Sequence, residues 1–229
     1  MKNIQLKLAT MLLLITALPA FSQNVQFHYD FGKDRHYETT TLEMFKPDKW
    51  GSTFWFVDMD YGSNDVKGVS LSYFEIARGL KFWDNPFELH VEYNGGFGQF
   101  MPGGAYQIND AWLFGGNYTW NNADFTRVFT LQAMYKSIRN YNKESFQITG
   151  VWGLHFFNKK VSFTGFADFW REEQVLDSKS TNFIFLTEPQ LWYNVTDHFS
   201  FGSEVEISSN FSQNKGFMVN PTLAVKWNF

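Results

Sequence analysis

The 229-residue sequence contains no cysteine, so no disulfide can stabilise the protein. After residue 22 it has no apolar run of the roughly 20 residues that a membrane helix needs. Only 18% of its residues are charged, and acidic residues outnumber basic ones, which disfavours a nucleic-acid partner. The sequence has no G-x-S-x-G motif, no phosphate-binding loop and no metal-ligand spacing. We therefore predict a protein that is not an enzyme and that has no cofactor and no metal site.

Residues 1–22 have the pattern of a secretory signal peptide. Lys2 and Lys7 precede an apolar run over 11–19, and small residues favour cleavage before Gln23. A membrane anchor is the alternative, but the run is too short to span a bilayer. We predict one mature domain, 23–229, which must be stabilised by packing or by a closed hydrogen-bonded architecture.

Aromatic residues make up 20% of the chain, with 27 Phe, although the mean hydropathy is only −0.30. This combination fits strands that alternate aromatic and polar residues, as the strand FELHVEY does at 87–93. We predict an all-β, transmembrane antiparallel barrel of about twelve strands. Their expected ranges are 25–31, 37–46, 51–61, 69–82, 87–97, 110–120, 125–136, 144–156, 160–172, 181–193, 199–209 and 217–229.

The connections alternate between tight turns, such as KPDK and FNKK, and longer loops such as GFGQFMPGGAYQIND. Short turns on one side and long loops on the other are typical of outer-membrane barrels, whose short turns are periplasmic. We expect the longest loop, over 95–110, to lie on the outer side, where it could fold inward as a constriction or plug. A row of aromatic residues beside the short turns predicts an interfacial girdle: Trp50, Trp83, Phe87, Trp120, Phe125, Phe156, Phe157, Tyr193 and Phe199.

Alternation alone also fits a soluble periplasmic binding barrel, whose apolar face would point inward. The aromatic row, the difference in loop length and the segment AVKWNF favour the membrane barrel instead. Phe229 and Trp227 share one face of this segment, which resembles the assembly signal of outer-membrane barrels. We therefore expect outer-membrane lipid and the barrel-assembly machinery as partners.

The segment FWFVDMDYGSNDVKGVSLSYFEIARGLKF, at 54–82, resembles the Tsx-like nucleoside-specific outer-membrane channels, or their neighbouring group of Tsx-like barrels without an assigned function. HYDFG at 28–32 and VKWNF at 225–229 lie where that family has its first and last strands. The resemblance implies a monomeric twelve-stranded barrel in the outer membrane, with a selective channel for passive diffusion of nucleosides and no cofactor.

Carboxylates cannot face hydrocarbon cheaply, so the alternation points them into the lumen. There they could bind the hydroxyls of a polar solute or select cations, or simply line a narrow barrel; inward rings could stack on a nucleobase or fill space. Arg78 falls on the outward face unless a bulge turns it, and the resemblance suggests such a bulge. The predicted lumen residues are Phe54, Phe56, Asp58, Asp60, Glu75, Arg78, Glu88, His90, Glu92, Asp168, Trp170 and Glu188.

Three functions follow from these patterns. The first is an outer-membrane channel for passive uptake of nucleosides or similar small polar solutes. The second is an outer-membrane barrel without transport, which serves adhesion or envelope structure, and the third is the soluble binding barrel.

Overall fold

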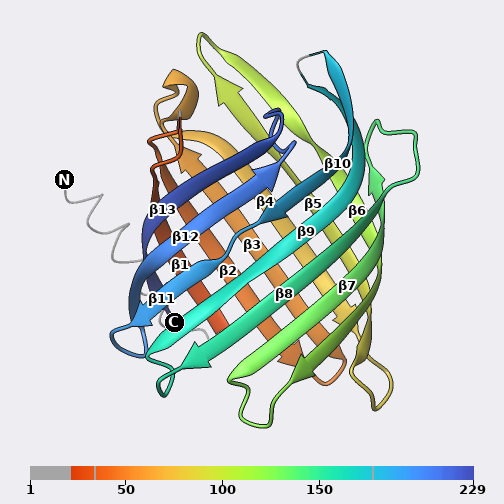
Figure 1. The fold of residues 1–229 in the computed structure, drawn as a ribbon, viewed down its shortest axis with the longest axis vertical. Coiled ribbons are helices and arrows are strands. Elements are labelled where there is room, and N and C mark those ends of the chain that lie inside the picture. Colours follow the sequence, from red (N-terminus) through yellow and green to blue (C-terminus); the bar gives the residue numbers. More distant parts are fainter. Residues whose placement is uncertain (1–21, 34, 177) are drawn as a thin grey trace, which may run out of the picture.

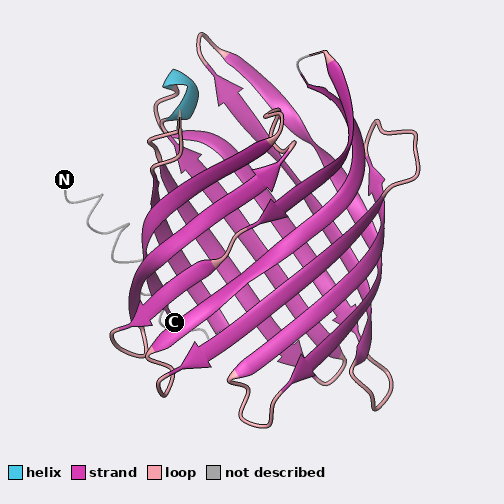
Figure 2. Ribbon diagram, viewed as in Figure 1, coloured by secondary structure: helices cyan, strands magenta, loops and turns pink. Residues whose placement is uncertain are grey.

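The computed structural model describes residues 22–33, 35–176 and 178–229, which form one closed antiparallel barrel (Figure 1). The predicted signal peptide lies outside the described residues, except for Ser22. Apart from a short 3₁₀ turn, η1 (Ser63–Asp65), the described elements are all strands (Figure 2). They are β1 (Ser22–Asp30), β2 (Glu38–Asp48), β3 (Gly51–Tyr61), β4 (Val69–Leu80), β5 (Phe87–Phe100), β6 (Gly104–Asn121), β7 (Arg127–Ile138), β8 (Phe146–Phe156), β9 (Val161–Leu176), β10 (Lys179–Thr187), β11 (Gln190–Asn194), β12 (Phe199–Ser209) and β13 (Phe217–Asn228).

The barrel has twelve wall positions, because β10 and β11 are successive parts of one position between β9 and β12. Pro189 interrupts this position, since proline has no N–H to donate to the ladder. The backbone beside the break stays bonded: Glu188 N–H donates to Phe166 O at 3.2 Å, and Val205 N–H donates to Pro189 O at 3.0 Å. Pairing of β13 with β1 closes the barrel. The predicted fold is thus confirmed, with the expected strand 181–193 divided in two.

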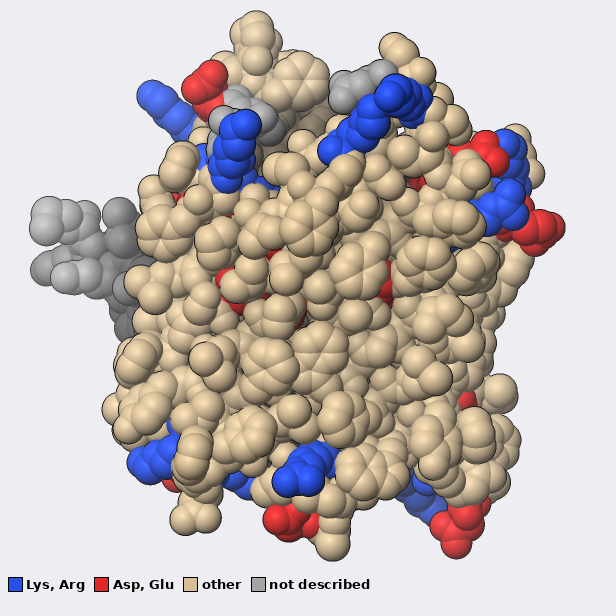
Figure 3. All heavy atoms as spheres, viewed as in Figure 1, with Lys and Arg blue, Asp and Glu red and all other residues tan. Residues whose placement is uncertain are grey.

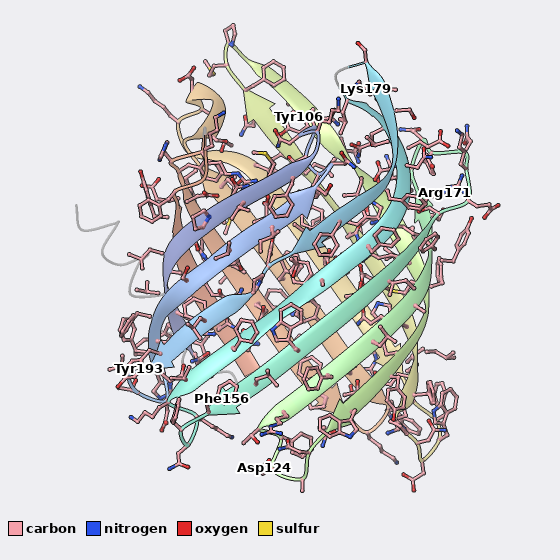
Figure 4. All side chains as sticks on the ribbon, in the orientation of Figure 1. Tyr106, Asp124, Phe156, Arg171, Lys179 and Tyr193 are labelled. Carbon is pink, nitrogen blue, oxygen red and sulfur yellow. The ribbon has the colours of Figure 1, made fainter. Side chains whose placement is uncertain are left out.

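The expected long loop at 95–110 is mostly strand. β5 and β6 continue as a hairpin that projects beyond the rim, with Tyr106 on the projecting part (Figures 1 and 4). Glycines permit this, because the Phe100 ring covers Gly104 and the Tyr106 ring covers Gly98, where a Cβ would lie only 2.2 Å and 2.3 Å from the ring atoms. The expectation of a long loop was therefore wrong, because these rings stabilise an extended pair of strands that leaves the rim.

Alternation sets the two faces of the wall. Along β1, Val25, Phe27 and Tyr29 point outward, whereas Gln26 and His28 are buried on the inner side. On the face drawn in Figure 3, charged side chains gather toward the two ends and are few in the band between them. Many large apolar side chains are exposed on the outer face of the wall. Such a surface is suited to contact with lipid. In a soluble binding barrel the apolar side chains would point inward, whereas here they point outward. Within the described ranges, no helix is long and apolar enough to cross a membrane.

The aromatic girdle lies at the short-turn end of the barrel, as predicted. All nine of its side chains are exposed, and Figure 4 shows Phe156 and Tyr193 at this end. The Trp83 Nε1–H donates to Phe87 O at 2.7 Å, so one indole also ties a turn to a strand. Amphipathic rings at this level are suited to the membrane–water interface.

The segment AVKWNF lies at one end of the paired region between β13 and β1. Trp227 points outward and lies opposite Val25, and Phe229 N–H donates to Gln23 O at 3.0 Å. The proposed role of Trp227 and Phe229 in recognition by the assembly machinery stays a prediction.

A closed ladder without edges should resist detergent at room temperature. We expect the unboiled protein in dodecyl sulfate to migrate on a gel at a different position from the boiled protein. Identical migration of the two samples would contradict a closed barrel.

Candidate functional site

The lumen of the barrel receives eleven of the twelve predicted site residues. Inward placement follows from the period-two alternation and from hydrogen bonds between inward side chains. These residues are Phe54, Phe56, Asp58, Asp60, Glu75, Glu88, His90, Glu92, Asp168, Trp170 and Glu188.

Arg78 is the exception, and its predicted place in the lumen is corrected. Strands β3 and β4 pair regularly around it, with Arg78 opposite Thr53, so the expected bulge is absent there. The guanidinium instead donates to Asp48 at 2.6 and 2.9 Å and to Thr53 Oγ1 at 2.9 Å. It therefore stabilises the short-turn end on the outer face. The register shift of this pair lies between Asp60 and Tyr61.

One lumen wall, formed by β3 and β4, combines rings with carboxylates. Phe56 lies opposite Glu75 in the register, and Asp58 lies opposite Tyr73. The Phe56 ring is 5.9 Å from the Phe54 ring and 6.0 Å from the Tyr73 ring, and all of these side chains are partly exposed. We call Phe54, Phe56, Asp58, Tyr73 and Glu75 the β3–β4 wall.

Hydrogen bonds fix the carboxylates of the β3–β4 wall. The Tyr73 hydroxyl donates to Glu75 Oε1 at 3.0 Å, and the Thr41 hydroxyl donates to Asp58 Oδ1 at 2.5 Å. Each carboxylate keeps a second oxygen that can accept a hydrogen bond from a solute. The prediction missed Tyr73 and Thr41, although both lie on inward positions by the same alternation.

Carboxylates from several strands project into the same part of the lumen. Glu188, at the β10–β11 break, interacts electrostatically with Glu204 on β12, Asp58 on β3, Glu206 and Asp168. We call Asp58, Glu188 and Glu204 the central carboxylate group. The Glu204 side chain keeps 19% of its surface exposed and accepts a 2.6 Å hydrogen bond from Gln190 Nε2.

The central carboxylate group concentrates acidic side chains in the middle of the lumen. Field lines concentrate in a narrow polar channel with low-dielectric walls, so like charges there have a large effect on permeant ions. In the described part of the chain, no three acidic or histidine side chains are arranged to hold a metal ion.

Two lysines in the lumen cover tryptophan rings. Lys136 Nζ lies 4.5 Å from the centroid of the Trp170 ring and donates to Gln147 Oε1 at 2.7 Å. Lys226 Nζ lies 4.0 Å from the centroid of the Trp192 ring. Trp170 is only 7% exposed and Trp192 is fully buried. Trp170 therefore faces the lumen as predicted but offers no free ring face for stacking.

His90 and Glu92 are buried together in the β5 wall. The His90 Nε2 atom is 2.9 Å from Glu92 Oε2, and Asn94 Nδ2 donates to Glu92 Oε1 at 3.2 Å. Glu88 accepts a 2.8 Å hydrogen bond from the Ser52 hydroxyl nearer the short turns. These three predicted residues thus have protein partners.

The segment between β1 and β2 carries an arginine that pairs with two carboxylates of the barrel wall. Arg35 pairs with Asp30 at 3.0 Å and with both oxygens of Glu206 at 2.9 and 3.0 Å, which joins this segment to β12. Burial, then the Asp60 charge, raises the pKa of Tyr37, so its hydroxyl stays protonated. This contact could not be predicted from the sequence, because a charged loop has no periodicity that places its side chains.

Comparison with known proteins identifies a family. The model of a "Domain of unknown function (DUF5020)" matches residues 22–229. No protein in the curated set matches the chain in sequence.

Solved outer-membrane porins share the fold. The NanC porin is 12% identical, with a TM-score of 0.59, and the similarity covers 91% of this chain and 100% of that chain. The KdgM porin is 13% identical, with a TM-score of 0.52, over 91% of this chain and 99% of that chain. A structure of KdgM in complex with disordered oligogalacturonate is similar to the same extent, at 12% identity and a TM-score of 0.52 over the same shares of the two chains. The resemblance to Tsx-like channels stays a prediction.

Proposed function

The chain belongs to the DUF5020 family, and from the lumen of its porin-like barrel we propose a passive outer-membrane channel for small polar solutes, with nucleosides as the preferred class. The observation that carries this proposal is the β3–β4 wall, where partly exposed rings and carboxylates share one inward face and Asp58 also belongs to the central carboxylate group. The nucleoside part also rests on the resemblance of 54–82 to nucleoside-specific channels.

A nucleoside has a flat base and a sugar with several hydroxyl groups. The Phe54 and Phe56 rings offer faces on which a base could stack, and Asp58 and Glu75 accept hydrogen bonds from hydroxyls. A channel must also release its solute, so each contact should be weak.

One solved structure of the KdgM porin is a complex with oligogalacturonate, which is an acidic sugar polymer. Here the central carboxylate group would repel a polyanion. We therefore propose that neutral and cationic solutes pass more readily than anionic ones.

A barrel without transport is the second candidate. Close packing beside β11 and β13 favours it, because Gln26, Trp192 and Ser200 are almost fully buried within the lumen. A barrel filled in this way serves structure or adhesion at the cell surface.

Liposome swelling tests the proposal and separates the two candidates. We expect proteoliposomes to swell in isosmotic adenosine or a neutral pentose, and more slowly in sodium galacturonate of equal osmolarity. Swelling equal to that of protein-free liposomes in every solute would favour the barrel without transport.

A further inference from the structure

A recess of about 490 Å³ lies on the outer face of the barrel where β5 and β6 leave the rim. A bulge creates it: Asn94 pairs with Ala111 and Gly96 with Ile108, so β6 carries one extra residue. Gly95 and Gly96 form part of the lining and leave the recess open, because a Cβ on Gly95 would lie 3.0 Å from the Asp110 Cβ.

The lower wall of the recess continues the lipid-facing surface. Phe74 and Tyr93 line it, and their ring centroids are 5.7 Å apart. Below them the row continues through Trp112, 4.9 Å from Tyr93, to Phe114, 6.1 Å from Trp112. Phe97, which also lines the recess, is exposed on the same outward face.

The upper edge is polar. Gln107 Nε2 donates to Asp110 Oδ1 at 3.3 Å, and Arg139 Nε pairs with the same oxygen at 2.6 Å. Arg139 Nη2 also donates to Asp110 Oδ2 at 3.2 Å, but the Arg139 side chain is 52% exposed and its Nη1 group remains to donate outward. Apolar rings below and hydrogen-bond donors above match the junction between an acyl chain and a headgroup.

We propose that this recess binds one outer-leaflet lipid with a phosphorylated sugar headgroup, with an acyl chain against Phe74, Tyr93 and Phe97 and the headgroup against Gln107 and Arg139. Three observations favour a single lipid. The recess is continuous with the lipid-facing row of rings, and its volume is that of a small-molecule site. The Arg139 guanidinium complements a phosphate group. A protein partner would need about 800 Å² of its own surface buried, far more than a recess of this size offers. The site is independent of transport through the lumen.

Native mass spectrometry of the full barrel in detergent tests this site, with monophosphoryl lipid A as the probe and phosphatidylethanolamine as the reference. We expect one bound lipid A and a weaker adduct of phosphatidylethanolamine. Phe97→Ser and Gln107→Ala should each weaken lipid A binding, Phe97→Ser by about tenfold because a Phe side chain loses its apolar contact. Gln107 lies on the exposed hairpin, so its variant also keeps the test valid if Phe97→Ser fails to fold.

The matched control is Phe201→Ser on β12, because Phe201 is 49% exposed on the outer face and Phe97 is 51% exposed. This control should bind lipid A as the parent does. Equal binding of the two lipids, equal losses for Phe97→Ser and Phe201→Ser, or a dimer that Phe97→Ser dissociates would each overturn the proposal. The dimer would assign the recess to a second copy of the chain.

Discussion

Replacing Glu188 and Glu204 with glutamine should lower the permeability ratio of K⁺ to Cl⁻ by about tenfold. Both carboxylates belong to the central carboxylate group; they lie on neighbouring wall positions, and Asp58 of the same group lies on β3. At a separation of about 8 Å and an effective dielectric constant of about 20, one carboxylate contributes about 2 kcal/mol before salt screening. The reversal potential in a KCl gradient measures the ratio.

The control for this experiment is Asp124→Asn, which removes a carboxylate from an exposed short turn. It should leave the reversal potential unchanged. If Glu188→Gln/Glu204→Gln kept the parent's ratio, the central carboxylate group would not set ion selectivity.

Removing the polar and aromatic contacts of the β3–β4 wall together should weaken nucleoside binding by about 100-fold. The triple variant is Phe56→Ala/Asp58→Asn/Glu75→Gln. Loss of stacking costs about 1–3 kcal/mol per base, and each hydrogen bond to a carboxylate adds about 1 kcal/mol. Each single variant should have a modest effect. The measurement is the adenosine concentration that blocks half of the ion current.

Trp170→Phe provides the matched control, because its ring also faces the lumen but is covered by Lys136. It should be blocked at the parent's adenosine concentration. A triple variant that binds like the parent, while still showing the gel shift of a folded barrel, would exclude the β3–β4 wall as the binding site.

The strands of the barrel wall could be predicted because the alternation of apolar and polar residues is visible within each strand separately. Alternation along FELHVEY fixes which side chains share a face, and the aromatic row and the difference in loop length assign the apolar face to lipid. For the same reason the inward positions of Phe56, Asp58 and Glu75 could be predicted, and their meeting follows from the pairing of two consecutive strands.

Contacts between distant strands could not be predicted in this way. The approach of Glu188 to Asp58 depends on the diameter of the barrel and on the break at Pro189. Arg35 reaches Glu206 from a segment without periodicity, and Lys136 covers Trp170 because β7 and β9 flank the same strand. In the β5–β6 hairpin, glycines suggested a loop, but cross-strand rings stabilise an extended pair.

Single-channel recording in planar bilayers, with adenosine titrated into the bath, tests the central claim most directly. The account predicts a steady cation-selective current that adenosine reduces reversibly and that oligogalacturonate leaves unchanged at the same concentration. A conductance that adenosine does not block would contradict the nucleoside assignment. The absence of any conductance from protein that shows the gel shift would contradict the channel itself.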